Sequence, residues 1–196
     1  KSIIALLILV VLIVAYLKIP FFRKKKQTSA VEKIRSISSI SIQKPEANYI
    51  QLFGDFKVLD KNGINISTQF TPKLKQLFLM ILLYSKRNKN GISTKELTDI
   101  LWMGHSSQSA KNSRGVTIRK LRLILESLET VQINLHIDRW AMTFSENVYC
   151  EYVECMKILK PEKIHVTDFN LKFYHIIQEG ELFKGESYDW LDDFKG

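Results

Sequence analysis

The first apolar pattern is an uninterrupted run over residues 3–17, which residues 19–22 extend after the single charge of Lys18. A stretch of about 20 apolar residues is long enough to cross a bilayer as a helix, so we predict a transmembrane helix over residues 2–22. Four cations follow at residues 23–26. This excess of positive charge predicts that the C-terminal side lies in the cytoplasm. A cleaved signal peptide is the alternative. In a signal peptide, however, the positive charges precede the apolar core, whereas here four cations follow it.

Residues 23–48 are polar, contain several serines and include Pro45. This composition is typical of a linker between folded parts, and we expect a cytoplasmic linker here. Alternating apolar positions follow over residues 49–59, with Gly54 between them, and predict two strands with a reversal. Asn62-Gly63 predicts a tight turn. Ile64 and Ile66 then alternate with polar neighbours and predict a further short strand.

Three helices are predicted next. Thr71 can cap the first helix, and Pro72 suits its first position because it has no amide proton to donate. Ser93 and Glu96 form a capping box that opens the second helix. A third helix is predicted from about residue 107 to residue 128, because apolar residues recur there at helical spacing. They are Ala110, Ile118, Leu121, Ile124, Leu125 and Leu128.

Two alternating segments, residues 131–137 and 140–145, predict a β-hairpin around Asp138-Arg139. The chain over residues 49–149 is thus predicted to run from antiparallel strands through three helices to a hairpin. This order indicates an α+β fold of the winged helix-turn-helix type, in which the longest helix enters the major groove of DNA and the hairpin lies along the backbone.

The charge is unevenly distributed. The chain of 196 residues has a formal net charge of +9. Residues 151–196 contain ten acidic and six basic residues, a net charge of −4, which leaves +13 on the first 150 residues. The basic part favours a polyanionic partner, either nucleic acid or an anionic membrane surface. The two cysteines, Cys150 and Cys155, are interpreted as reduced thiols, and no metal site or cofactor is expected.

The predicted third helix contains the candidate chemistry. No aspartate or glutamate occurs between Leu101 and Leu125, although this stretch has five basic residues. Its polar side can offer amides and guanidinium groups to base edges and positive charge to phosphates. The residues predicted to contact DNA, including one at the tip of the hairpin, are Lys111, Asn112, Ser113, Arg114, Val116, Thr117, Arg119, Lys120, Arg122 and Arg139.

Other interpretations of these residues are open. The cationic surface can be an ordinary solvated face, although such faces usually mix charges in i,i+4 pairs. Arg114 lies near the apolar stripe and either reaches a phosphate or pairs inside the protein. Arg139 is expected to touch phosphate or enter a minor groove, whereas Trp140 is assigned to the core.

The same segments resemble a known family. Residues 70–77, 92–102 and 109–125, with Ser109-Ala110-Lys111-Asn112-Ser113 opening the last of them, look like the winged-helix domain of antibiotic-regulatory-protein (SARP) type regulators, which is related to response-regulator effector domains. In that family a helical bacterial transcriptional activator domain follows, and residues 150–196 resemble its beginning.

The resemblance implies that Asn112, Ser113, Thr117 and Lys120 face DNA or lie next to it. Two residues depart from the family's pattern. Arg114 replaces a residue that is usually apolar, and Gly115 lies inside the helix, where it either allows a close approach to DNA or weakens the helix.

We therefore expect a membrane-anchored transcriptional regulator in the bacterial inner membrane, with a single span and a cytoplasmic C-terminal domain. Its sensor is expected outside the cytoplasm, before Lys1. The expected partners are double-stranded DNA, a second copy of the chain on DNA, and RNA polymerase as a further candidate. The alternative is a winged-helix protein-interaction module. No nucleophile, phosphate-loop or metalloprotease motif indicates an enzyme.

Overall fold

The computed structural model describes residues 44–88, 90–159 and 173–195. The chain divides into two units, residues 1–43 and 44–196, so all described residues belong to the second. The predicted transmembrane helix at residues 2–22 and most of the predicted linker at residues 23–48 lie outside the described residues. Within the described ranges, no helix has both the length and the apolar character that a bilayer crossing requires.

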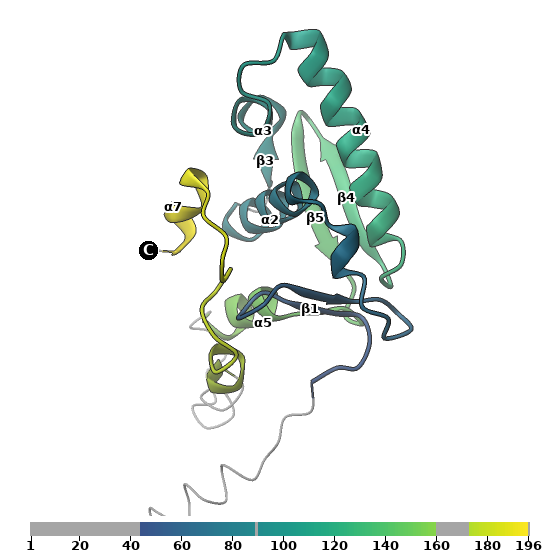
Figure 1. Cartoon of the computed structure of the whole chain (residues 1–196), viewed down its shortest axis with the longest axis vertical. Helices are drawn as coiled ribbons and strands as arrows, with labels where there is room; N and C mark the ends of the chain where they lie inside the picture. The colour runs from purple at the N-terminus through teal and green to yellow at the C-terminus, as the bar shows by residue number, and fades with distance from the viewer. Residues whose placement is uncertain (1–43, 89, 160–172, 196) are drawn as a thin grey trace, which may run out of the picture. The chain divides into compact units, whose positions relative to one another are not determined.

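The second unit is a mixed α+β fold, as predicted (Figure 1). Strand β1 (Tyr49–Gln51) pairs antiparallel with β2 (Lys57–Leu59) and parallel with β6 (Tyr149–Cys150). The predicted reversal at Gly54 is confirmed, with φ at +72°. A side chain there would also come within 2.3 Å of the carbonyl oxygen of Glu179, so only glycine fits.

The third strand predicted at Ile64 and Ile66 is wrong, because only an isolated bridge joins Leu59 to Asn65. The side-chain oxygen of Asn65 accepts hydrogen bonds from the amide and the hydroxyl of Ser67, at 3.0 and 2.6 Å. These bonds hold the chain at the start of the 3₁₀ helix η1 (Ser67–Gln69), so it cannot continue as a strand.

Helix α2 (Pro72–Arg87) forms the centre of the unit, with Thr71 as its cap, as predicted. The side chain of Thr71 accepts a hydrogen bond from the amide of Leu74. Seven consecutive residues, 77–83, are each at most 1% exposed. A helix that is apolar on all sides is stable only when it is covered all round, and the strands and the other helices provide this cover.

Helix α3 (Thr94–Leu101) follows the short strand β3 (Ile92–Ser93), and Ser93 accepts from the amide of Glu96 as the capping box predicts. Burial, and then interaction with the carboxylate of Glu96, raise the pKa of the Tyr84 hydroxyl to about 12.

Helix α4 (Ser107–Leu125) is the longest helix described. It ends three residues before the predicted Leu128, because the hydroxyl of Ser127 donates to the carbonyl of Ile124 and the last residues form a turn.

The predicted hairpin is confirmed as β4 (Val131–His136) and β5 (Arg139–Phe144), with β3 paired on the other side of β5. Its predicted tip is wrong by one residue. The turn residues are Ile137 and Asp138, with φ of 43° and 63°, and Arg139 already pairs with His136 inside the hairpin. The carbonyl of Asp138 also accepts from the amide of Thr94, which fixes this register.

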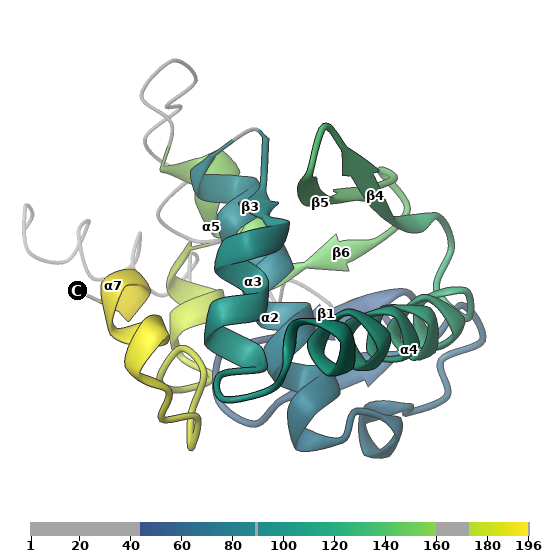
Figure 2. The ribbon, with the colours of Figure 1, turned by 90° about the horizontal axis from the view of Figure 1, so that it is seen from above.

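Residues 150–195, where described, belong to the same compact unit as residues 49–149. Helix α5 (Glu151–Ile158) follows β6, and the 3₁₀ helix η3 (Asp189–Leu191) leads into α7 (Asp192–Lys195). Figures 1 and 2 show α7 and α4 on opposite sides of α2.

The C-terminal segment reaches β1 at a place that we call the Glu151 junction, formed by residues 52–54, Glu151 and residues 179–183. The amide of Phe183 donates to the carbonyl of Leu52 at 2.8 Å, and the amide of Gly54 donates to the carbonyl of Glu181 at 2.9 Å. Glu151 is 1% exposed. Its carboxylate accepts from the amides of Leu52 and Phe53, both at 2.9 Å, and from the hydroxyl of Tyr49.

Candidate nucleic-acid interface

Helix α4 has one buried side and one open side. Ala110, Ile118, Leu121 and Leu125 are buried against the rest of the unit, as their helical spacing predicts. The side chains on the opposite side of the helix are exposed, and the hairpin β4–β5 lies beside α4 (Figure 1). We call this side the outer face of α4; it consists of Gln108, Lys111, Asn112, Gly115, Val116, Arg119, Lys120 and Leu123.

Three cations of the outer face keep their charge available. The side chains of Lys111, Arg119 and Lys120 are exposed, and they form no ion pair or hydrogen bond within the part of the chain that the structure describes. Because the whole helix lacks acidic residues, no neighbouring carboxylate on α4 neutralises them. They therefore form a positive surface that can bind an anion without first breaking an internal contact.

Two other arginines predicted to touch DNA are held by backbone carbonyls instead. Arg122 donates from Nε and Nη2 to the carbonyl of Ile133, at 3.2 and 2.7 Å, and its guanidinium lies 5.7 Å from the centre of the Trp140 ring. Arg139 donates to the carbonyl of Gly91 at 2.6 Å and to that of residue 90 at 3.3 Å. Arg122 thus joins α4 to the hairpin, and Arg139 joins the hairpin to the loop before β3.

Arg114 also has an internal partner, which was one of the two interpretations of its place near the apolar stripe. Its Nη1 donates to the side-chain oxygen of Thr98 at 2.5 Å, and its side chain is half-buried. The bond connects α4 to α3. Arg114 therefore fixes the angle between these two helices rather than adding to the outer face.

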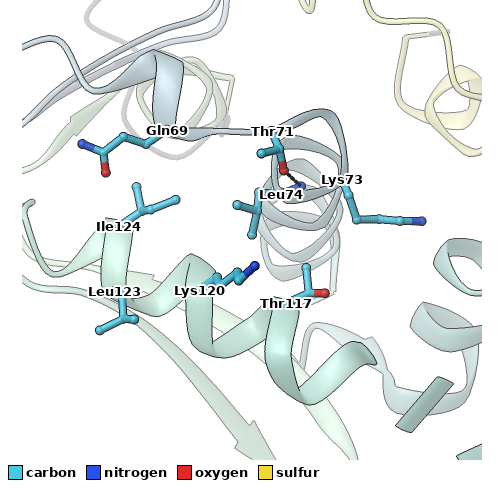
Figure 3. Close-up of a pocket in the computed structure, with 8 residues that line it drawn as sticks. All are labelled: Gln69, Thr71, Lys73, Leu74, Thr117, Lys120, Leu123 and Ile124. Atoms are coloured by element: carbon cyan, nitrogen blue, oxygen red, sulfur yellow. Dashed lines mark hydrogen bonds between the residues drawn. The ribbon is translucent and has the colours of Figure 1, made fainter. Parts of the chain in front are cut away.

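Ser113 and Thr117 lie at the margin of the outer face and are half-buried. The hydroxyl of Thr117 donates to the carbonyl of Ser113 at 2.7 Å. Thr117 and Lys120 also line a groove of about 540 Å³ between α4 and the start of α2 (Figure 3). In this view the side chain of Lys73 extends away from α4, and its amine donates to the carbonyl of Leu101.

The sequence prediction included Asn112 but missed its partner on the outer face, Gln108. The Nε2 of Gln108 donates to the Oδ1 of Asn112 at 3.0 Å, one helical turn away. The two side chains are exposed. Their i,i+4 spacing is the signal that could have identified the pair.

Both cysteines are buried. Burial raises the pKa of the Cys150 and Cys155 thiols to about 12, so they stay protonated at neutral pH. Among the described residues, no group of three or more histidine, cysteine or acidic side chains is arranged to hold a metal ion.

Comparisons of the chain with protein-family models, with curated proteins and with solved structures found no match.

Proposed function

We propose that the chain is a membrane-anchored transcriptional regulator that binds duplex DNA through a winged helix. In this proposal α4 is the recognition helix in the major groove, and the hairpin β4–β5 is the wing. The observation that carries it is the outer face of α4, where Lys111, Arg119 and Lys120 are exposed and have no acidic neighbour on the helix. A major groove about 12 Å wide admits an α-helix, and phosphates line both of its edges.

The order of elements supports the same proposal. Helices α3 and α4 follow each other across a short turn, and the hairpin β4–β5 comes next. The internal partners of Arg114, Arg122 and Arg139 hold α4 against α3 and the hairpin against both α4 and the loop before β3. A rigid frame of this kind suits a helix that must keep one orientation in a groove.

The membrane anchor is proposed from the sequence, through residues 2–22 and the cations at residues 23–26. In this proposal an extracytoplasmic sensor brings two copies together at the inner membrane, and their recognition helices bind half-sites about 34 Å apart, which is one turn of DNA. RNA polymerase is then the expected downstream partner.

A salt titration of DNA binding tests this proposal. The full chain, kept in an uncharged detergent, is titrated with a fluorescent duplex of mixed sequence at several salt concentrations. Each neutralised phosphate contributes about −0.9 to the slope of log K against log salt, so three cations predict a slope of about −3 or steeper per protomer. On this mixed-sequence duplex, which holds no selected site, Arg119 and Lys120 both bind phosphate, so in the Arg119→Ala, Lys120→Ala variant the slope should become shallower by about 2.

The matched control removes the same charge elsewhere. Lys157 and Lys184 are exposed and pair with Glu154 and Asp55, at 2.6 and 3.0 Å. The Lys157→Ala, Lys184→Ala variant should keep the slope of the original chain. An equal loss in both variants, or binding that does not depend on salt, contradicts the proposal.

The second candidate function is a protein-interaction module, favoured by the exposed apolar side chains of Val116 and Leu123 on the outer face. An acidic protein partner would then bind the cations of α4. DNA binding that persists unchanged after Arg119 and Lys120 are neutralised points to this function.

A further inference from the structure

The outer face of α4 has a lysine at each margin, and between the two lysines lie the amides of Gln108 and Asn112 and the guanidinium of Arg119. On a helix with 3.6 residues per turn, Lys111 and Lys120 lie on opposite flanks of the row formed by Gln108, Asn112 and Arg119. Lysines on the two flanks can reach phosphates on the two walls of a groove, and the central row then faces the base edges. The central row is therefore the part of α4 that can distinguish one DNA sequence from another.

We infer that this row, together with Val116 beside it, reads an A·T pair through Gln108, Asn112 and Val116, and a G·C pair through Arg119, about three base pairs further along. This inference rests on the proposed function and adds the sequence chemistry of the half-site. It assigns a role to Gln108, and it separates base-reading residues from the lysines that bind phosphate.

The amide pair has the hydrogen-bonding groups that adenine needs. Because the Nε2 of Gln108 donates to the Oδ1 of Asn112, the pair still presents the Nδ2 donor of Asn112 and the Oε1 acceptor of Gln108. Exchanging the orientation of both amides again leaves one donor and one acceptor. Adenine offers an acceptor at N7 and a donor at N6, whereas guanine offers two acceptors. Guanine would place its O6 against an amide oxygen, so adenine is favoured.

Val116 provides the apolar contact that identifies thymine. Its side chain is 57% exposed and lies one turn after Asn112. At 1.5 Å per residue this is about 6 Å along the helix, less than two base-pair steps. The C5-methyl group of thymine is the apolar group that an A·T pair presents in the major groove. Next to Val116, Gly115 has no atom within 4 Å of the place where a Cβ would lie, which leaves room for the DNA to approach.

Arg119 is suited to guanine. Its guanidinium has no partner among the described residues, and arginine donates two parallel hydrogen bonds to O6 and N7 of guanine. Arg119 follows Asn112 by seven residues, a rise of about 10.5 Å or roughly three base-pair steps. This rise sets the predicted separation between the two base pairs.

The first step of the test selects duplexes from a pool of random sequence with the full chain at a salt concentration that weakens non-specific binding. An enriched half-site with an A·T pair and a G·C pair about three steps apart is expected. Enrichment without this pair of positions overturns the inference. Salt-dependent binding without any enrichment also overturns it and leaves the proposed function standing, whereas no binding to DNA at any salt concentration removes both.

The second step assigns each position to its residue on the selected duplex. Asn112→Ala should lower discrimination between A·T and G·C at its position about tenfold, without changing the salt slope. Arg119→Lys keeps the charge and should lose the preference for guanine. Replacing the thymine by deoxyuridine should lower the DNA affinity of the original chain about fourfold, which corresponds to one lost methyl contact. The same replacement should leave the DNA affinity of the Val116→Ala variant unchanged. A deoxyuridine effect that is equal in both proteins, or base preferences that survive Asn112→Ala and Arg119→Lys, overturns the inference.

Discussion

At the Glu151 junction the polar groups of three distant segments satisfy one another, whereas three cations on the outer face of α4 have no partner among the described residues. Glu151 is 1% exposed and accepts three hydrogen bonds. Lys111, Arg119 and Lys120 are exposed, and no hydrogen bond or ion pair to another described residue holds them. The difference separates polar groups that hold the fold together from polar groups that are available to a partner, and each group of residues should respond differently to substitution.

The largest effect is expected at the junction. Glu151→Ala leaves two backbone amides and the hydroxyl of Tyr49 buried without an acceptor, and each unsatisfied group costs about 1–3 kcal/mol. The free energy of unfolding should fall by about 3 kcal/mol or more. Denaturant unfolding measures this loss. A loss below about 1 kcal/mol would show that the junction contributes little to stability.

Arg122 and Arg119 lie on the same helix, and only Arg122 has hydrogen-bond partners among the described residues. Arg122→Ala should lower the free energy of unfolding by about 1–2 kcal/mol, because its hydrogen bonds to the carbonyl of Ile133 disappear. Arg119→Ala should change stability by less than about 0.5 kcal/mol but should weaken DNA binding clearly more than Arg122→Ala does. Unfolding and DNA titrations of both variants check this. If Arg122→Ala and Arg119→Ala change stability and DNA affinity equally, the internal hydrogen bonds of Arg122 do not separate its role from that of Arg119.

Gly115→Ala should affect stability and binding in opposite directions. Alanine favours a helix by up to about 1 kcal/mol over glycine, and the new methyl group meets nothing within 4 Å in the protein. The thermal midpoint should therefore rise. DNA affinity should fall several-fold if the groove approaches this position closely. A rise in both quantities indicates that DNA does not approach Gly115.

The smallest effect concerns pH. Burial raises the pKa of Glu151 above its ordinary value of 4.5, and its hydrogen bonds with Tyr49, Phe53 and Leu52 oppose this rise only in part. The folded state therefore holds the proton more tightly than the unfolded state does. The protonated Glu151 carboxyl therefore contributes its full stabilisation below the ordinary pKa of a glutamate. This stabilisation is lost as the pH rises through the pKa that Glu151 has in the folded state.

Glu151→Gln should remove this pH dependence, because the amide does not titrate. Unfolding of both proteins over about pH 4 to 8 measures it, and the difference between the two curves isolates Glu151 from the other carboxyl groups. A stability difference between the two proteins that stays constant across this pH range would contradict a raised pKa of Glu151.

The elements that follow from local rules could be predicted from the sequence. Thr71 and Ser93 cap their helices as their spacing indicates, and the buried stripe of α4 follows its apolar period. The amide pair of Gln108 and Asn112 follows from the same kind of local spacing.

Contacts between distant segments could not be predicted in this way. Glu151 meets Leu52 across 99 positions, and Arg139 meets the carbonyl of Gly91 across 48 positions. The hairpin turn lies one residue earlier than predicted, and remote groups contact it there: β3 pairs with β5, and the amide of Thr94 donates to the carbonyl of Asp138. In these cases the partner is a backbone group or a remote segment, which side-chain patterns do not reveal.

In the proposed complex, DNA covers the outer face of α4 and leaves the surface around α5 and the C-terminal segment open. Lysine acetylation followed by mass spectrometry, with and without a saturating duplex, tests it most directly at four exposed side chains. We expect DNA to protect Lys111 and Lys120 strongly and to leave Lys157 and Lys184 as reactive as in the free protein. Equal protection of all four lysines, or protection of Lys157 and Lys184 alone, would contradict the claim.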